Sequence, residues 1–320
     1  MKKVLSLFSG AGGLDFGFFK AGYKIIGSAE IDENAVETHN KNFNLNSVPT
    51  NLVDENHYKK FIDKFKNKKI DLIIGGFPCQ GYSLAGKRNL KDSRNQLYKV
   101  IPDIINELKV NFFVLENVPG ILSIDNKREI KKIENYFNQK NLFFKYKILD
   151  TTFFEVPQKR KRVIFIGCND KTKLNKIEYI FKKLSDIKKK IITVRDAIGD
   201  LENIKENKKI NHIYTKHSYE MKKRISKIKT GESLYKNYSD GWKRINYDDF
   251  SPTVKENHGG VHIHPVKNRV LTPRELARLQ TFPDDFIFLG SKTSQLIQIG
   301  NAVPVNFAKE LGTKVFELFR

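Results

Sequence analysis

Short apolar runs alternate with amphipathic segments along most of this chain. Runs that have the length and composition of buried β-strands lie at residues 4–8, 23–29, 70–74, 111–115, 143–149 and 163–167, and a further strand is one interpretation of 47–54. Apolar residues at helical spacing predict helices at 14–21, 96–108 and 305–319. Strands that alternate with helices predict an α/β fold, and we expect a Rossmann-like, doubly wound, mostly parallel sheet.

This alternation stops between residues 169 and 190, where lysines become frequent. It resumes at Thr272 and Pro273, which mark a helix start because proline suits the first turn of a helix. We therefore predict a main domain made of residues 1–188 and 272–320, with the last helix packing back on its first part. Residues 189–271 are rich in turn-forming residues and should form a smaller, irregular and mainly β domain.

Charge and cysteine usage narrow the class of protein. Lysine and arginine number 58 against 36 aspartates and glutamates, which gives a formal net charge of +22. This charge attracts polyanions, so nucleic acid is the expected partner, although a lysine-rich composition spread over a solvated surface gives the same total. Cys79 and Cys168 lie far apart, which supports neither a disulfide framework nor a cysteine-rich zinc site. Neither a signal peptide nor a membrane-spanning run is found, so we expect a cytoplasmic protein.

The region 189–271 combines aromatic, basic and imidazole side chains. It contains the only tryptophan, Trp242, and five histidines, which are His212, His217, His258, His262 and His264. His262 and His264 have no third ligand at helical or turn spacing, so we expect no metal site. Basic residues interleaved with these aromatic ones favour a surface that faces DNA.

A glycine-rich turn follows the first expected strand. Residues 9–13 read Ser-Gly-Ala-Gly-Gly, and Glu30 ends the second strand twenty positions after Gly10. Glycines let a ligand approach the backbone, the next helix offers free N–H groups, and a carboxylate at this place can accept two ribose hydroxyls. The pattern predicts an adenosine-type cofactor, and Asp15 in place of the third fingerprint glycine argues against a pyrophosphate. Asp54 is a candidate contact to the adenine amino group, with an ordinary loop aspartate as the equal alternative.

A second turn, at residues 75–83, follows the strand expected at 70–74 and places Cys79 near the carboxyl end of that strand. Pro78 fixes the backbone before the sulfur, so the thiol is held in one direction. The alternative is a small apolar filler, which free cysteines often are. The basic stretch 84–99 has the character of a lid that closes over a substrate, and a plain surface loop is its alternative.

Ionisable residues also lie at the ends of later strands. Glu116 follows the strand at 111–115 and should face the same crevice as Cys79, unless it only caps a turn. Arg160 and Arg162 should point to one side of their segment because side chains alternate along a strand. Two guanidiniums placed this way can bind a phosphate, a carboxylate or a base carbonyl, although a solvated basic patch is the commoner result of such spacing.

Six sequence blocks together resemble the cytosine-5 DNA methyltransferase family of the bacterial restriction-modification type. They lie in the family's order along nearly the whole chain, at residues 8–13, 76–80, 116–118, 158–162, 274–283 and 298–304. One such block can arise by chance, but six in order cannot plausibly do so. The resemblance implies the S-adenosylmethionine-dependent methyltransferase fold, with a catalytic, cofactor-binding domain at 1–188 and 272–320 and a target-recognition domain at 189–271.

The resemblance also implies a reaction, in which a methyl group passes from S-adenosylmethionine to C5 of a flipped-out cytosine in a short duplex site. Cys79 would add to C6 of the base, Glu116 would hold N3 and the amino group, and Arg162 would contact the base carbonyl with Arg160 supporting its loop. The implied cofactor residues are Phe8, Gly10, Ala11, Gly12, Gly13, Glu30, Ile31, Asp54, Pro78, Leu97, Asn301 and Val303. The expected DNA contacts are Ser83, Lys87, Arg94, Arg244, Thr253, Lys255, Asn257, Gly259 and Gly260.

The partners implied by the resemblance are double-stranded DNA and a cognate restriction endonuclease of the same system that is not a required complex. S-adenosylhomocysteine would be the product, and the enzyme would act as a monomer, associated with the nucleoid through DNA. One rival is an RNA cytosine-5 methyltransferase, but the Cys-Phe-Thr tripeptide of those relatives is absent from this chain. A nicotinamide-dependent oxidoreductase is disfavoured by Asp15 and gives Cys79 no role. A non-catalytic DNA-binding module would not need Cys79 together with Glu116.

Overall fold

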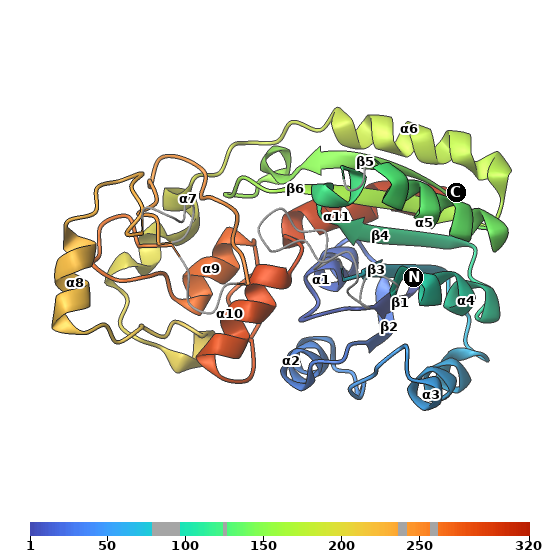
Figure 1. Cartoon of the computed structure of the whole chain (residues 1–320), viewed down its shortest axis with the longest axis horizontal. Coiled ribbons are helices and arrows are strands. Elements are labelled where there is room, and N and C mark those ends of the chain that lie inside the picture. Colours follow the sequence, from blue (N-terminus) through green and yellow to red (C-terminus); the bar gives the residue numbers. More distant parts are fainter. Residues whose placement is uncertain (79–96, 124–126, 236–241, 257–261) are drawn as a thin grey trace.

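A six-stranded sheet forms the centre of the computed structural model, which describes residues 1–78, 97–123, 127–235, 242–256 and 262–320 (Figure 1). Its strand order is β2-β1-β3-β4-β6-β5. The strands are β1 Lys3–Leu7, β2 Lys24–Ala29, β3 Leu72–Gly76, β4 Phe112–Asn117, β5 Phe143–Asp150 and β6 Lys161–Cys168. The first four strands are parallel, whereas β6 runs antiparallel to both of its neighbours. The chain leaves β1 on one side for β2 and returns on the other side for β3, so the ligand position of this sheet class lies at the carboxyl ends of β1 and β3.

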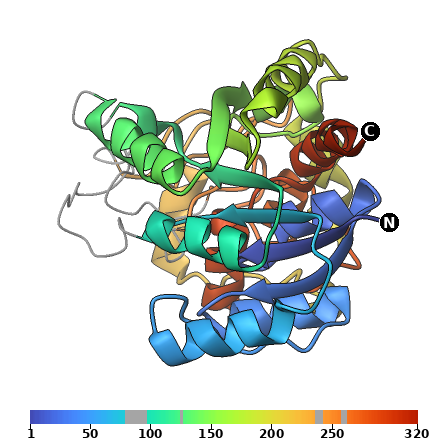
Figure 2. The same ribbon diagram turned by 90° about the vertical axis from the view of Figure 1, so that its right-hand side faces the viewer.

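Helices cover both faces of the sheet, as Figure 2 shows from the side. One hydrophobic cluster packs α3 Glu55–Phe65, α4 Val100–Glu107 and α5 Arg128–Gln139 on one face. A second cluster packs α1 Gly13–Lys20, α6 Leu174–Ser185 and α11 Val305–Val315 on the other face. The predicted doubly wound α/β fold is therefore confirmed. Packing of the last helix on the first part of the chain is also confirmed, because α11 lies against α1.

One predicted strand is wrong. Residues 47–54 form neither a helix nor a strand, and Asp54 instead begins α3 by accepting a hydrogen bond from the His57 N–H, with an Oδ1 to N distance of 2.9 Å. Aspartate competes well for this position because its carboxylate satisfies a free N–H at the helix start. A preference for capping therefore overrides the weak apolar pattern of this segment.

A second group of helices lies beyond the carboxyl ends of the parallel strands β1–β4, at the opposite end of the molecule from α4 (Figure 1). A third hydrophobic cluster joins α7 Val194–Ile198, α9 Pro273–Leu279 and α10 Lys292–Asn301. The start of α9 is fixed by reciprocal hydrogen bonds between Thr272 and Glu275, as the predicted helix start requires. The domain division stays a prediction, and the third cluster crosses its expected boundary at 271/272.

The region 189–271 differs from the expected mainly β composition. Within its described residues it contains α7, α8 Tyr219–Ser226 and short 3₁₀ turns, whereas β-structure is limited to isolated bridges such as that of Arg244 with Ile263. Its apolar residues are too sparse and irregular to sustain paired strands. The remaining elements of the chain are α2 Glu33–Phe43 and the 3₁₀ turns η3 Pro119–Leu122, η5 Thr151–Phe154, η6 Lys171–Lys173, η7 Gly199–Asn203, η8 Lys208–Ile210 and η9 Phe316–Phe319. Among the described helices, none combines the length and apolar character needed to cross a membrane.

Candidate active site

Glu116 and Arg162 form an ion pair where three strands end or begin. The Glu116 carboxylate, near the end of β4, lies 2.5 Å from Nε of Arg162, near the start of β6, and both side chains are nearly buried. Their proximity follows from the antiparallel pairing of β4 with β6. Gly76, in register with Glu116, leaves room for this carboxylate, since a Cβ there would lie 3.1 Å from Oε2. A charged pair with limited solvent access can orient a polar ligand strongly.

The end of β3 is tied to the end of β4 beside this pair. The buried Asn117 side chain donates to the Phe77 carbonyl oxygen over 3.2 Å. The chain leaving β3 is thus held next to Glu116 as far as Pro78, which is half-buried. Cys79 follows directly in sequence and lies outside the described residues, as do the expected DNA contacts Ser83, Lys87, Arg94, Asn257, Gly259 and Gly260.

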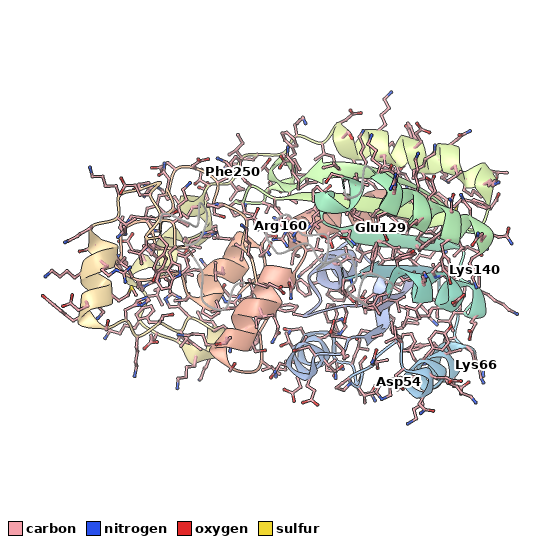
Figure 3. All side chains as sticks on the ribbon, viewed as in Figure 1. Asp54, Lys66, Glu129, Lys140, Arg160 and Phe250 are labelled. Carbon is pink, nitrogen blue, oxygen red and sulfur yellow. The ribbon has the colours of Figure 1, made fainter. Side chains whose placement is uncertain are left out.

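Arg160 is a buried cation that joins distant segments. Its guanidinium, 2% exposed, donates to the carbonyl oxygens of Val254, Gly300 and Ala302 over 2.8, 3.2 and 3.0 Å. Figure 3 shows it where the sheet meets the group of α9 and α10. Burial, with the nearby charge of Arg162, lowers the pKa of Arg160, and the three carbonyl oxygens offset the lost hydration. The alternative of a solvated basic patch does not fit either arginine.

We expect Arg160→Lys to lower the free energy of unfolding by about 2–4 kcal/mol, because one ammonium cannot reach three carbonyl oxygens and would leave some unsatisfied. Urea denaturation measures the change. Arg195→Lys is the control, since the Arg195 ion pair with Asp248 is largely exposed and solvent screening leaves it little effect on stability. Equal stability of Arg160→Lys and the wild type would contradict the role of Arg160 as a structural cation.

Glu30 is fixed at the end of β2 by backbone donors. Its carboxylate accepts hydrogen bonds from the N–H groups of Gly10, Ile31 and Asp32 over 2.8, 2.7 and 3.0 Å. The predicted proximity of this acid to the glycine turn is therefore present in the structure. Beside it, the Ile31 side chain is 63% exposed, so an apolar surface adjoins the carboxylate. A fixed acid next to an apolar surface suits a ligand with a sugar and a flat ring.

The glycine turn touches the segment before α11. A Cβ on Gly13 would lie only 2.4 Å from the carbonyl oxygen of Val303. Gly12, the residue that precedes α1, has a φ of +97°, which favours glycine, and any Cβ there would collide with Phe43 and His39. Two predicted groups of cofactor residues, at 10–13 and 301–303, are thus in contact.

The predicted cofactor residues differ in their exposure to solvent. Ala11 and Val303 are buried, Phe8 and Leu97 are half-buried, and Asn301 is exposed. Asp54 is exposed and lies at the start of α3, well away from Arg160 in Figure 3. Its Oδ1 is occupied by the cap of α3, so an adenine contact would have to use the remaining acceptor capacity of the carboxylate.

The structure does not support the DNA contact expected for Arg244. Its guanidinium is buried and donates to five backbone carbonyl oxygens, of Ile225, Ile228, His264, Pro265 and Lys267, and to the Asn268 side chain. It therefore holds the end of α8 against residues 264–268. Thr253, by contrast, is half-buried and donates to the Lys159 carbonyl oxygen over 2.6 Å, and Lys255 is half-buried.

Some organising residues were missed by the sequence patterns. Asp15, interpreted only as a missing glycine, is buried and pairs with His39 over 3.1 Å, and the His39 ring stacks on Phe43. An acid in the first turn of an otherwise apolar helix was the available signal. Gln158 and Gln280 lie within the recognised blocks, but nothing in the pattern shows that both are fully buried and bonded to each other.

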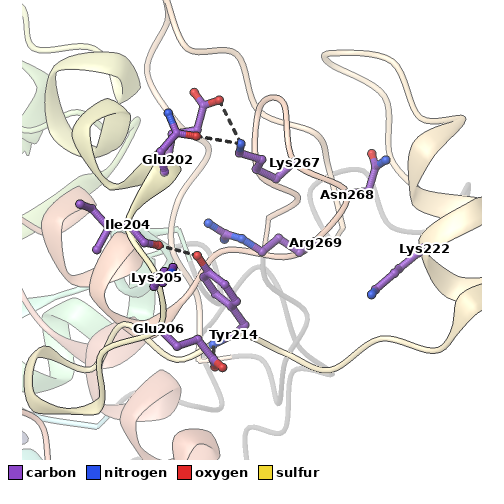
Figure 4. Close-up of a pocket in the computed structure, with 10 residues that line it drawn as sticks. Glu202, Ile204, Lys205, Glu206, Tyr214, Lys222, Lys267, Asn268 and Arg269 are labelled. Atoms are coloured by element: carbon purple, nitrogen blue, oxygen red, sulfur yellow. Dashed lines mark hydrogen bonds and ion pairs between the residues drawn. The ribbon is translucent and has the colours of Figure 1, made fainter.

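A separate pocket of about 770 Å³ lies in the region 189–271 (Figure 4). Its walls include Tyr214, Lys222 and Arg269. Three further wall residues are linked to one another, because Lys267 contacts both Glu202 and Asn203. Neither Glu116 nor Arg162 lines this pocket, so it is distinct from the candidate active site. Within the part of the chain that the structure describes, no group of three His, Cys, Asp or Glu side chains could hold a metal ion.

The chain is similar to known proteins over nearly its whole length. The family model described as "C-5 cytosine-specific DNA methylase" matches residues 2–317. The type II methyltransferase M1.HphI of Haemophilus parahaemolyticus is 36% identical, over 98% of this chain and 86% of its own. M.HindV of Haemophilus influenzae, also a type II methyltransferase, is 34% identical, over 98% of this chain and 96% of its own.

A solved structure also matches over the whole length. It is a candidate DNA modification methyltransferase encoded within a prophage (E. coli), with a TM-score of 0.82, 30% identity and coverage of 100% of this chain and 99% of its own. The Entamoeba histolytica methyltransferase EhMeth has the same fold, with a TM-score of 0.69 at 18% identity and coverage of 100% of this chain and 99% of its own.

Proposed function

This chain belongs to the C-5 cytosine-specific DNA methylase family, and from that membership we propose how its residues methylate cytosine in a short, specific duplex site. The observation that carries the proposal is the Glu116–Arg162 ion pair, which lies where β4 ends and β6 begins. It places a carboxylate and a guanidinium together, nearly buried, beside the strand end from which Cys79 follows. These are the groups needed to hold one polar edge of a cytosine.

The residues around the glycine turn fit S-adenosylmethionine. Glu30 would hold the ribose hydroxyls, Ile31 would contact the adenine ring, and residues 10–13 and 301–303 would lie against the rest of the molecule. The fixed Glu30 carboxylate and the absence of Cβ atoms at Gly12 and Gly13 support this assignment. When bound, S-adenosylmethionine supplies an electrophilic methyl group, and S-adenosylhomocysteine remains after transfer.

Cytosine C5 is a poor nucleophile within the aromatic ring, and the residues of this chain change that. The Cys79 thiolate forms a bond to C6, which moves electron density toward C5 and N3. Glu116 holds N3 with a proton or hydrogen bond and accepts from the amino group, so charge that develops on N3 is stabilised. Arg162 holds the Glu116 carboxylate and lies within the site to contact the base carbonyl. Once C5 carries the methyl group, a base removes its proton, the S–C6 bond breaks and the thiolate is released.

The target base must leave the helical stack to reach these groups, because C6 cannot be attacked inside a duplex. The described segment 251–255 and the basic stretch 84–99 are the proposed elements that contact DNA around the extruded base. The net charge of +22 supports binding to a polyanion of this kind. We also propose a monomeric enzyme that works on DNA in the cytoplasm, with a cognate endonuclease in the same restriction-modification system.

Bisulfite sequencing of DNA from a host that lacks cytosine-5 methylation and expresses this gene tests the function. We expect complete methylation at one cytosine within a single short motif. Unmethylated DNA together with methylated host RNA would favour the RNA methyltransferase alternative. Unmethylated DNA and RNA from cells that contain the folded protein would favour the non-catalytic module.

Glu30→Ala should weaken S-adenosylmethionine binding by about 10–100-fold, because hydrogen bonds to a charged group contribute about 1.5–3 kcal/mol. Calorimetric titration without DNA measures this affinity directly. Glu33→Ala is the matched control, since Glu33 is exposed in the first turn of α2 and should leave the affinity unchanged. Equal affinities of Glu30→Ala and the wild type would remove Glu30 from the cofactor site.

A further inference from the structure

A closed ring of buried hydrogen bonds connects the segment proposed to contact DNA with the segment proposed to contact the cofactor. Its members are Val254, Gln158, Gln280, Ala302 and Arg160, and each is less than 9% exposed. Val254 belongs to the segment 251–254, and Ala302 belongs to the segment 301–303. Both segments have already been assigned to ligand contacts, so the ring lies between the two binding sites.

On the DNA side, residues 251–254 run along residues 157–160. The Lys159 N–H donates to the Ser251 carbonyl oxygen over 2.9 Å, and the Ser251 N–H donates to the Pro157 carbonyl oxygen over 3.0 Å. Val254 is held at both polar groups, because its N–H donates to Gln158 Oε1 over 2.9 Å and its carbonyl accepts from Arg160 over 2.8 Å. A shift of this segment must therefore move Gln158 and Arg160.

On the cofactor side, the Ala302 carbonyl oxygen accepts from two members of the ring. Gln280 donates to it over 3.2 Å and to the Ile299 carbonyl oxygen over 2.8 Å, while Arg160 donates to it over 3.0 Å. The ring closes through the amide pair, since Gln158 Nε2 donates to Gln280 Oε1 over 2.7 Å. Ala302 lies between Asn301 and Val303, and Val303 contacts Gly13 of the glycine turn.

The two segments also touch directly beside the ring. A Cβ on Gly300 would lie 2.4 Å from the backbone carbon of Lys255 and 2.5 Å from the backbone nitrogen of Glu256. Backbone packed this closely cannot shift on one side without displacing the other. Arg162, which pairs with Glu116, follows Arg160 by two residues on the same segment.

We propose that Gln158 and Gln280 are positioning residues that couple DNA binding to cofactor binding, an inference that rests on the proposed function. A cognate duplex that holds residues 251–255 in one position also holds residues 299–303 through the amide pair, so each ligand raises the affinity for the other. Such coupling is reciprocal by thermodynamic necessity. A purely structural pair would instead change both affinities without changing their dependence on each other.

The test compares S-adenosylhomocysteine affinity with and without a saturating duplex that carries the methylated motif. For the wild type we expect the duplex to tighten binding at least about fivefold, the lower end of typical coupling. Gln280→Met keeps the side-chain volume and removes all three side-chain hydrogen bonds of Gln280, to Gln158, Ile299 and Ala302. The ratio should therefore fall below about twofold. Gln298→Met is the matched control and should keep the wild-type ratio. Gln298 is buried on α10, and among the described residues its amide donates to Leu289 and Ser294 rather than to a member of the ring.

A wild-type ratio near one, or a wild-type ratio retained by Gln280→Met, would overturn the coupling role. If Gln280→Met does not fold, as judged by its thermal transition, Gln158→Met makes the same test from the other side of the amide pair. Loss of both affinities with an unchanged ratio would show a structural role only. Failure of the wild type to bind either ligand alone would instead reject the proposed function, so the two failures are distinguishable.

Discussion

Cys79→Ala should abolish methyl transfer, with a loss of at least about 10⁴-fold, because alanine has no sulfur to form the proposed bond to C6 that activates C5. Binding of the cognate duplex should persist, since the phosphate contacts that dominate affinity do not involve the thiol. Tritium incorporation from labelled S-adenosylmethionine measures transfer, and a gel-shift titration measures binding.

The second cysteine gives a matched control. Cys168 is buried, with Sγ against the Asp170 carbonyl oxygen, on β6 away from the Glu116 end of that strand. Cys168→Ala should turn over at the wild-type rate, and its stability should fall only modestly. Retained incorporation in Cys79→Ala would reject the nucleophile, and equal loss in both variants would point to damaged folding.

Glu116→Gln should lower kcat by about 10²–10⁴-fold, the usual contribution of a positioned acid or base. Glutamine keeps the shape of the side chain but cannot supply a proton to N3, and it removes the charge that pairs with Arg162. Because Glu116 is proposed to act as charge develops in the transition state, kcat should fall by a larger factor than the KM for DNA rises. Single-turnover rates at saturating DNA measure the step without product release.

Glu129→Gln is the control for that substitution. Glu129 is also a buried glutamate, but it lies on α5 and pairs with Lys132. Its amide variant should turn over at the wild-type rate. A Glu116→Gln rate within about threefold of the wild type would remove Glu116 from the chemistry.

The apolar runs predicted the sheet well because parallel strands are buried on both faces. The runs at 70–74 and 111–115 became β3 and β4, and the turn residues after them marked the strand ends where Glu116 lies. The weak run at 47–54 failed because Asp54 caps α3. Local capping chemistry and strand pattern compete within such short segments, and a single sequence does not show which of the two dominates.

The contacts of the site could be predicted only in part. The predicted strand ends placed Glu30 beside the glycine turn, as the structure has it. The ion pair of Glu116 with Arg162 depends on β6 running antiparallel to β4, and the alternation of strands and helices in the sequence does not determine that direction. Arg244 was expected at a DNA surface, yet five backbone carbonyl oxygens bind it inside the fold. Residue type gives the charge of a side chain, whereas its exposure follows from how distant segments pack.

Trapping the covalent intermediate tests the proposed mechanism most directly. The substrate is a duplex with 5-fluorocytosine at the methylated position, because fluorine cannot leave C5 as a proton does and the S–C6 bond then persists. With S-adenosylmethionine present, wild-type protein should give a protein–DNA band that survives denaturing electrophoresis, and Cys79→Ala should give none. Absence of this band from active wild-type enzyme on its own motif would contradict covalent catalysis by Cys79.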